Sequence, residues 1–318
     1  MSEHQAPEQQ TVTAENDTRL DQLLARTWDR LSRQDIDEMI RKGQVLINER
    51  EALKPGQRIE AGDTVAVTLP APTETEEARA PVVPLDVLYE DDYLLVVNKP
   101  AGMAMKRTRY IDPSGLVLPE VLGKLYPGSA HVGGADRAGI VTRLEPQVSG
   151  LVVAARDGDT YRQLRRSIKR ERMERVFSAL IEGHLDGEHT IEQPIGNAKH
   201  QRSRLRVSRT GRPAETFVRA QRHYRMGEDS FTLAYVRPDS ARLHQIRVHV
   251  AWYGFPIVGD YKYGARARNV LTTDRIFLHL SLVEFPHPRI EDEFVHVESA
   301  LPTELQSAIG FLRRPKWS

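Results

Sequence analysis

The sequence predicts an α+β protein, with a main domain built on a mixed or antiparallel sheet and a small α/β unit before it. From residue 86 onward, short apolar runs typical of strands outnumber segments with a helical period. The helical segments are interspersed among these strands, which is the pattern of an α+β sheet domain. A stretch rich in proline and glutamate at residues 70–85 separates this part from the unit that precedes it.

The bulk composition is that of a globular protein without disulfides. Of 318 residues, 40% are hydrophobic and 28% are charged, and there is no cysteine. Without thiols the chain can form neither disulfides nor thiolate zinc sites, which fits a reducing cytosol. No apolar run approaches the length of a membrane span, and the N-terminus is too polar for a signal peptide. We therefore expect a cytoplasmic protein with no membrane partner.

The N-terminal part predicts a disordered tail followed by a small domain at residues 18–69. Residues 1–17 are polar and lack an apolar period, so disorder is expected there. Leucines within residues 20–24 indicate a short helix. A capping box at residues 32–35 begins a second helix, which Gly43 ends. Alternating apolar residues then predict short strands near residues 45–47 and 65–69.

The main domain is expected at residues 86–318, after the linker at residues 70–85. It begins with two apolar runs between residues 87 and 99, which a polar turn separates and Pro100 ends. The rest of the pattern predicts helices at about 159–171 and 243–253, and strands near 176–182, 203–207, 214–221 and 231–236.

A polar loop between two apolar runs is the strongest candidate for a functional site. The runs at residues 138–141 and 151–155 are predicted to be buried strands, and the loop between them carries Arg143 and Glu145. An acid and an arginine on a loop held by two strands are a usual mounting for a reactive group. The alternative is a surface ion pair on a hairpin, which the spacing alone does not exclude.

The amino-acid sequence of this loop resembles a known catalytic motif. Residues 142–145 (Thr-Arg-Leu-Glu), followed by Ser-Gly-Leu at 149–151, are similar to the His-Arg-Leu-Asp motif of the RluA/RluD-type pseudouridine synthases. The resemblance covers residues 86 to about 312 and includes three further motifs, at residues 98–102, 242–260 and 277–288. Residues 19–48 resemble a small ribosomal RNA-binding domain, the S-four-like domain.

The resemblance implies an isomerisation of uridine to pseudouridine within RNA. The bond from C1′ to N1 breaks, the detached uracil rotates, and C5 bonds to the sugar, without a cofactor or a metal. Carried over to this sequence, the carboxylate is Glu145 and its partner cation is Arg247. Arg143 takes the place of the arginine that holds the target base flipped out of the stack. The implied aromatic and apolar pocket residues are Phe177, Leu180 and Ile246.

Three residues depart from the family pattern. Thr142 replaces histidine, Glu145 replaces aspartate, and Phe177 replaces tyrosine. The extra methylene of glutamate moves its oxygens by about 1 Å, and a misplacement of that size can cost about 100-fold in rate. Phe177 can stack on a base but cannot move a proton. The alternative function is therefore a catalytically inactive relative that binds RNA in ribosome assembly.

Basic clusters predict RNA as the partner, and the resemblance implies ribosomal RNA in preference to transfer RNA. Residues 1–85 hold 10 Lys and Arg against 16 Asp and Glu, whereas the remainder holds 35 against 28. The residues expected to contact phosphate are Arg33, Arg41, Lys42, Arg165, Arg166, Lys169, Arg202, Arg204 and Arg206. A solvated helix face is the alternative for each cluster taken singly. His244 and His249 lack a third ligand at metal-site spacing, so we expect structural histidines and no metal.

Overall fold

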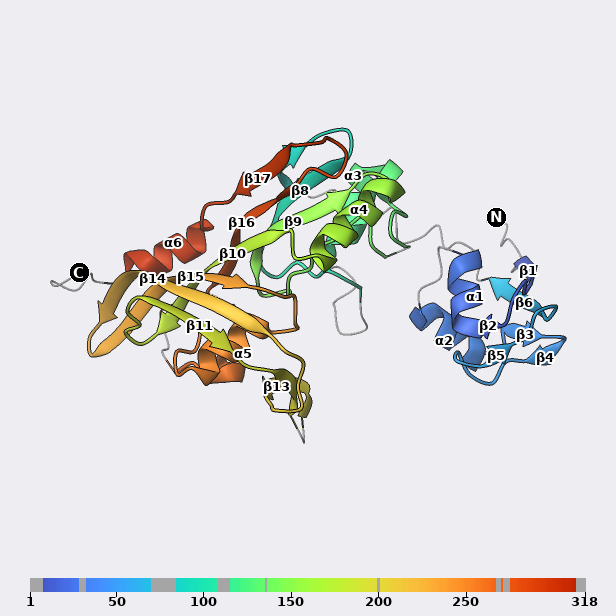
Figure 1. The fold of residues 1–318 in the computed structure, drawn as a ribbon, viewed down its shortest axis with the longest axis horizontal. Helices are drawn as coiled ribbons and strands as arrows, with labels where there is room; N and C mark the ends of the chain where they lie inside the picture. Colours follow the sequence, from blue (N-terminus) through green and yellow to red (C-terminus); the bar gives the residue numbers. More distant parts are fainter. Residues whose placement is uncertain are drawn as a thin grey trace, which may run out of the picture. The chain divides into compact units, whose positions relative to one another are not determined.

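The protein was analysed as a computed structural model, whose fold is drawn in Figure 1. By compactness the chain divides into two units, Met1–Val83 with Lys106–Gly139, and Pro84–Met105 with Ile140–Ser318. The structure describes residues 8–28, 33–69, 84–107, 115–134, 136–198, 201–266, 270 and 275–312.

The first unit packs two helices against a small sheet of order β1-β6-β3-β4. Its core is formed by apolar side chains of both helices and of the sheet, including Leu20, Leu24, Ile36 and Val65, all fully buried. The unit also contains α3 and a short 3-10 helix. The elements are β1 (Glu8–Thr13), β2 (Thr18–Arg19), α1 (Leu20–Thr27), α2 (Arg33–Arg41), β3 (Val45–Ile47), β4 (Arg50–Glu51), β5 (Arg58–Ile59), β6 (Thr64–Leu69), α3 (Leu118–Leu125) and η1 (Pro127–Ser129).

Strand β1 differs from the disordered tail expected at residues 1–17. Residues 8–13 pair antiparallel with β6, and Val12 is packed against the core of the unit. The indole Nε1 of Trp28 donates to the side-chain oxygen of Gln10 at 2.6 Å. The alternation of Thr11, Val12 and Thr13 has the period of a half-buried strand, which the polar composition of the tail obscured.

The second unit is organised on a nine-stranded sheet. The path runs β11-β14-β15-β10-β16-β9-β8-β7, with β17 pairing with β16, and only the β16–β9 pair is parallel. This confirms the predicted mixed sheet and the α+β class. The elements are β7 (Asp86–Glu90), β8 (Leu94–Lys99), β9 (Ser149–Ala155), α4 (Gly158–Lys169), β10 (Glu174–Glu182), β11 (Glu188–Glu192), β12 (Ile195–Ala198), β13 (Gln201–Val207), β14 (Glu215–Met226), β15 (Asp229–Pro238), α5 (Gln245–Trp252), η2 (Tyr261–Tyr263), β16 (Leu278–Pro286), β17 (Phe294–Glu298) and α6 (Thr303–Gly310).

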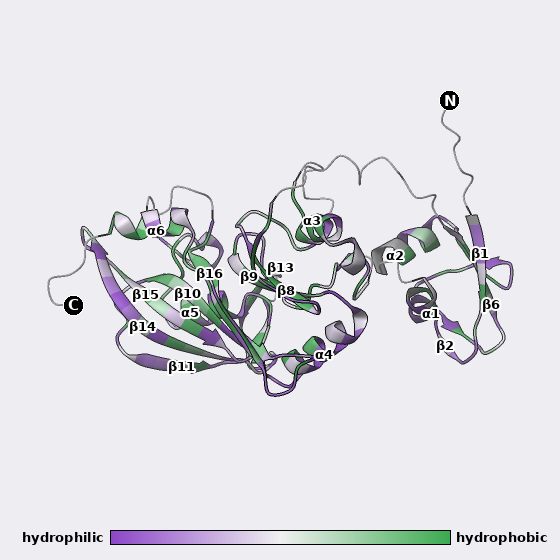
Figure 2. Ribbon diagram, turned by 90° about the horizontal axis from the view of Figure 1, so that it is seen from above, coloured by the Kyte–Doolittle hydropathy of each residue, from purple (hydrophilic) through white to green (hydrophobic). Residues whose placement is uncertain are grey.

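Hydropathy follows the position of each strand in this sheet. Every residue of β9 is buried, whereas β11 and β14 mix buried, half-buried and exposed residues and are largely hydrophilic (Figure 2). A strand buried on both faces must be continuously apolar, which is why β9 was recognisable from sequence. Among the residues that the structure describes, no helix is both long and apolar enough to cross a membrane.

The apolar run at residues 138–141 is not the strand that the sequence predicts. Ala138 and Gly139 have φ angles of +43° and +74°, which are incompatible with an extended strand. Only Ile140 forms an isolated bridge, to Ala154, and the amide of Val141 donates to the carbonyl of Val153 at 2.9 Å. The candidate loop is therefore held by one regular strand, β9, and by these two contacts on its other side.

Candidate active site

Glu145 lies on a loop that is fixed through the backbone of the next residue. The carbonyl oxygen of Pro146 accepts hydrogen bonds from the Gly102 amide at 2.8 Å and from Lys99 Nζ at 3.2 Å. Lys99 is fully buried and also donates to the carbonyls of Pro100 and Met103. Its burial lowers the pKa of Lys99 to about 7. The motif at residues 98–102 thus positions the loop that carries the acid.

The Ser-Gly pair that follows the loop joins β9 to β16. Gly150 has a φ of +123°, and a Cβ at this position would lie 2.3 Å from the carbonyl oxygen of Leu280. Only glycine allows two strands to approach so closely in this conformation. The hydroxyl of Ser149 lies 2.9 Å from Nδ1 of His279 and accepts from Arg275 at 2.8 Å. These residues hold the loop in place and do not reach the acid.

Arg247 stands between two carboxylates and joins the sequence-distant motifs. Its Nη1 forms an ion pair with Glu145, and its Nε and Nη2 donate to the two oxygens of Asp260, each at 2.7 Å. The side chains of Arg247 and Asp260 are 5% and 0% exposed, and that of Glu145 is 22% exposed. A guanidinium that makes a bidentate hydrogen bond with a carboxylate has a fixed orientation. The remaining Nη1 is thereby aimed at Glu145, the only partly exposed member of the three.

Burial sets the ionisation of this group. Burial raises the pKa of Glu145 above its ordinary value, and the Arg247 charge and hydrogen bond oppose that shift. Burial alone would lower the pKa of Arg247. The hydrogen bonds that Arg247 donates to Asp260 and the negative charges of both acids outweigh this effect, so the pKa of Arg247 is raised. The guanidinium is therefore a permanent cation. Glu145 is the group whose charge can change.

Two further side chains enclose the acid. His244 Nε2 lies 3.5 Å from the Glu145 carboxylate, and His244 Nδ1 lies 2.7 Å from the Tyr263 hydroxyl. Burial and the nearby Arg247 charge lower the pKa of His244 to about 4, so this imidazole is neutral at neutral pH. The Arg247 guanidinium lies 5.0 Å from the centre of the Tyr263 ring, within cation–π range.

The predicted aromatic and apolar residues lie on the elements that frame this group. Phe177 lies on β10, 8% exposed, between Val236 of β15 and Leu280 of β16. Leu180 and Ile246 are both buried. The carbonyl of Leu180 accepts from the Val258 amide at 2.9 Å, which ties the segment carrying Asp260 to β10.

Thr142, in the histidine position of the motif, has a structural role. Its side chain is buried, and its hydroxyl accepts a hydrogen bond from the Val153 amide of β9 at 2.9 Å. Arg143 is exposed, and no ion pair or hydrogen bond to it occurs within the described part of the chain. The loop therefore turns Thr142 inward and leaves Arg143 open to a ligand.

The predicted basic clusters differ in their surroundings. Arg165, Arg166 and Lys169 are exposed on α4 and form no ion pair among the described residues. Arg165 Nη1 lies 3.5 Å from the carbonyl of Val141, so α4 presents it beside the Glu145 loop. A cavity of about 370 Å³ lies on the same helix, lined by Arg162, Arg166, Arg170 and Arg172 among others.

Strand β13 carries a second basic cluster, one member of which lies beside Tyr263. Arg204 and Arg206 are exposed, and the Arg204 guanidinium lies 5.6 Å from the centre of the Tyr263 ring. The Leu205 amide donates to the Tyr263 hydroxyl at 3.2 Å. The side chains of Arg33 and Arg202 lie outside what the structure describes.

Two of the predicted cations, at the C-terminal end of α2, are already paired with acids. Arg41 forms an ion pair with Asp37, and Lys42 with Glu38 at 2.8 Å, both at i,i+4 spacing. All four side chains are more than 40% exposed, so each pair is weak and can be exchanged for phosphate.

Sequence reasoning missed Asp260, Tyr263, His244 and Lys99 as members of the site. Asp260, His244 and Lys99 lie inside recognised motifs, so motif membership was a usable signal. Tyr263 lies on η2, just after Asp260 and outside the motifs, so no signal in the sequence pointed to it. His249 is buried and bonded at both nitrogens, to Thr216 and Gln193, which is a structural role.

Comparisons with known proteins identify the family of this chain. Residues 93–252 match the sequence profile of the RNA pseudouridylate synthase family, and residues 18–65 match that of the S4 domain. An uncharacterized RNA pseudouridine synthase of Bacillus subtilis is 34% identical over 301 residues, which are 93% of this chain and 94% of that protein. The ribosomal large subunit pseudouridine synthase D of Escherichia coli K12 is 34% identical over 309 residues, 93% of this chain and 90% of that protein.

Solved structures share the fold. Human RNA Pseudouridylate Synthase Domain Containing 1 superposes with a TM-score of 0.60 at 23% identity, covering 74% of this chain and 91% of that one. Human RNA Pseudouridylate Synthase Domain Containing 4 superposes with a TM-score of 0.55 at 20% identity, covering 73% of this chain and 95% of that one. With the relatives in sequence, these findings show that the chain belongs to the RNA pseudouridylate synthase family of isomerases and carries an S4 domain.

Proposed function

We propose that this chain converts uridine to pseudouridine in ribosomal RNA and that Glu145 is the carboxylate of the reaction. The observation that carries the proposal is the contact of Glu145 with an arginine that Asp260 holds from the other side. Two relatives that cover most of the chain are named as pseudouridine synthases, one of them of the ribosomal large subunit.

The longer acid is compatible with the arrangement of the site. Its carboxylate reaches Arg247, so the extra methylene has not broken the pairing that keeps it ionised and aimed. In the reaction the C1′–N1 bond breaks, the uracil turns, the C1′–C5 bond forms, C5 releases its proton, and N1 takes up a proton, so that the product is an isomer of uridine. Glu145 acts at the sugar, as nucleophile or as base, and returns to its starting state.

The surrounding residues divide the remaining work. Exposed Arg143 enters the space that the flipped base leaves and offsets the unstacking cost of a few kcal/mol. Phe177 supplies an apolar face for the base. Because Phe177 has no hydroxyl, solvent or another group takes the proton from C5. The cations of α4 and β13 contact the RNA backbone.

The test is a modification assay with the purified full chain and unmodified large-subunit ribosomal RNA. We expect pseudouridine at a defined position, found by chemical tagging and primer extension, and none with Glu145→Ala. The Arg166→Gln variant is the matched control, since it removes a phosphate contact and leaves the acid intact. If the wild-type chain binds this RNA and modifies nothing, while Glu145→Asp modifies it, the chain is an inactive RNA-binding relative instead.

A further inference from the structure

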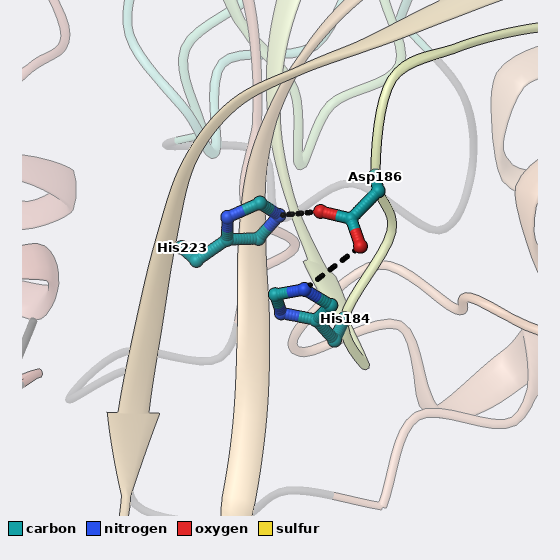
Figure 3. A group of neighbouring side chains, drawn as sticks. All are labelled: His184, Asp186 and His223. Atoms are coloured by element: carbon teal, nitrogen blue, oxygen red, sulfur yellow. Dashed lines mark ion pairs between the residues drawn. The ribbon is translucent and has the colours of Figure 1, made fainter. Parts of the chain in front are cut away.

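A second polar cluster lies in the same unit as the Glu145 site, on other residues. His184 and Asp186 lie in the loop between β10 and β11, and His223 lies on β14 (Figure 3). His184 Nε2 is 3.0 Å from one oxygen of Asp186, and His223 Nε2 is 3.5 Å from the other. Both imidazoles thus point at one carboxylate (Figure 3).

The loop that carries His184 and Asp186 is fixed to the sheet. Thr232, the cross-strand partner of His223, is fully buried; its hydroxyl donates to the carbonyl of Gly183 at 2.9 Å and accepts from the Leu185 amide at 3.0 Å. Leu185 is buried, so its side chain anchors the centre of the loop between the two ligands.

The ends of the loop are equally constrained. The Gly183 amide donates to Ser230 at 2.8 Å, and Ala220 donates to the carbonyl of Gly187 at 2.9 Å. The carbonyl of Asp186 lies 2.7 Å from Nε2 of His189. A set of side chains on a loop held at so many points is preorganised, which lowers the entropic cost of binding a ligand.

We propose that His184, Asp186 and His223 bind a divalent transition-metal ion, with Zn²⁺ as the reference case. Two imidazoles and one carboxylate are a donor set used for zinc and for ferrous iron. Donors about 2.1 Å from a tetrahedral zinc lie about 3.4 Å from one another. The two observed His–Asp separations, 3.0 and 3.5 Å, are close to that value, and all three donor atoms lie within 4.8 Å of one another.

The packing of the two rings supports a shared ligand. The imidazoles of His184 and His223 are stacked, with centroids 4.0 Å apart and planes at 28°. The stacking holds the two rings side by side, so that one ion can be reached by a nitrogen of each. The side chains of His184, Asp186 and His223 are 40%, 74% and 19% exposed, which leaves room for water to complete the coordination.

Metal binding requires a defined movement of one proton. His223 Nε2 lies 2.8 Å from the carbonyl of Leu185 and donates to it when that nitrogen carries the hydrogen. Binding of the metal to Nε2 places the hydrogen on Nδ1, so the ring stays neutral and changes only its tautomer. Protons compete with the metal for the ligand nitrogens, so the affinity for the metal should fall on acidification.

The test measures Zn²⁺ binding to the full chain after chelator treatment, by calorimetry and by metal analysis after dialysis. We expect one tightly held ion per chain, a higher melting temperature with zinc, and weaker binding at pH 5.5 than at pH 7.5. Loss of an outer-shell partner already costs about 10–100-fold in metal affinity, so Asp186→Asn, which removes a ligand, should cost at least that much. Asp186 is exposed, so this change should leave the fold intact.

The matched control is His296→Ala. His296 lies on β17 with Glu284 and Glu298 at 2.7 and 3.2 Å, so it is a surface histidine beside acids outside the proposed site. Zinc binding that survives in His296→Ala and is lost in Asp186→Asn and His184→Ala supports the proposal. Two results would overturn it. One is that the wild-type chain does not bind zinc at 100 µM, a concentration that corresponds to a binding free energy of about 5.5 kcal/mol. The other is that all variants bind zinc equally. Neither result depends on pseudouridine formation.

Discussion

The charged groups around Glu145 and those on α4 illustrate two uses of charge within one unit. Arg247 is buried, shared by two acids and fixed in orientation. Arg165, Arg166 and Lys169 are exposed and free of acidic partners among the described residues. Buried charges interact strongly and do not rearrange, whereas exposed charges are screened by salt and adapt to a ligand. The first arrangement suits chemistry at one atom, and the second suits contact with a long polyanion.

The largest expected effect comes from removing the acid itself. Glu145→Ala should lower the single-turnover rate of tritium release from C5-labelled uridine in RNA by about 1,000-fold or more, because no other group performs its step. RNA affinity, measured by filter binding, should change less than about threefold. If the affinity for RNA fell as much as the rate, Glu145 would serve RNA binding, as the cations of α4 are expected to do.

Removing the positioning residue Asp260 should come next. Asp260→Asn leaves the buried Arg247 with one acid instead of two, and breaking a buried pair costs about 3–5 kcal/mol of folding stability. Urea denaturation should show this loss, and kcat should fall while KM stays within about twofold. The control is Asp159→Asn, whose ion pair with Arg162 is exposed and should contribute no more than about 1 kcal/mol.

Neutralising the exposed helix should weaken binding without slowing the chemistry. Changing Arg165, Arg166 and Lys169 to Gln together removes up to three phosphate contacts. The slope of log K against log salt should fall by about 2–3, since each contact contributes about 0.7–0.9. The rate at saturating RNA should stay unchanged. A slope equal to that of the wild-type chain would show that RNA does not cross α4.

The pH dependence should be carried by Glu145 and not by α4. In the proposed reaction Glu145 acts as a carboxylate, and burial raises the pKa of Glu145 above its ordinary value of 4.5. Activity should therefore be lost on acidification at a higher pH than an ordinary glutamate would give. The folding stability depends on pH in the opposite direction to the activity. The reason is that Glu145 binds its proton more tightly in the folded state than in the unfolded chain. The stability contribution is thus present at low pH and lost as the pH rises through the folded-state pKa.

The smallest effect is expected on α2. Arg41 and Lys42 are exposed and paired with acids one turn away, and such pairs contribute about 0.3–0.5 kcal/mol. Changing both to Gln should leave the melting temperature within about 2 °C. The salt slope should fall by less than the α4 triple variant causes, since α2 must break its own pairs to bind phosphate. An equal or larger fall would make the S4 domain the main RNA contact.

Much of the fold was predictable because local pattern and burial agreed. The apolar run within β9, the amphipathic α4 and the residues of the Glu145–Arg247 pair followed from period and motif. Residues 138–141 did not, because an apolar run does not reveal the positive φ angles of Ala138 and Gly139 that prevent a strand. Strand β1 was missed for the opposite reason, since its polar residues hid a β period.

The site was predictable only where a motif named its parts. Tyr263 entered through tertiary contacts, with the His244 imidazole, the Leu205 amide and the Arg247 guanidinium. The pairing of Arg247 with Asp260 also required the fold, because the segment before Asp260 is fastened to β10. His184 and His223 are far apart in sequence, so no ligand spacing could have indicated their proximity.

The backbone of Leu280 fixes the spacing of two segments of this chain. It pairs with Gly150 on one side and with Phe177 on the other, so a single strand separates the acid-bearing segment from the aromatic position. Two strand spacings, about 9.6 Å, are thereby built into the sheet. Neither segment can slide to compensate for a longer or shorter acid. A change in the reach of residue 145 therefore has to come from the length of its side chain, and Glu145 is one methylene longer than aspartate.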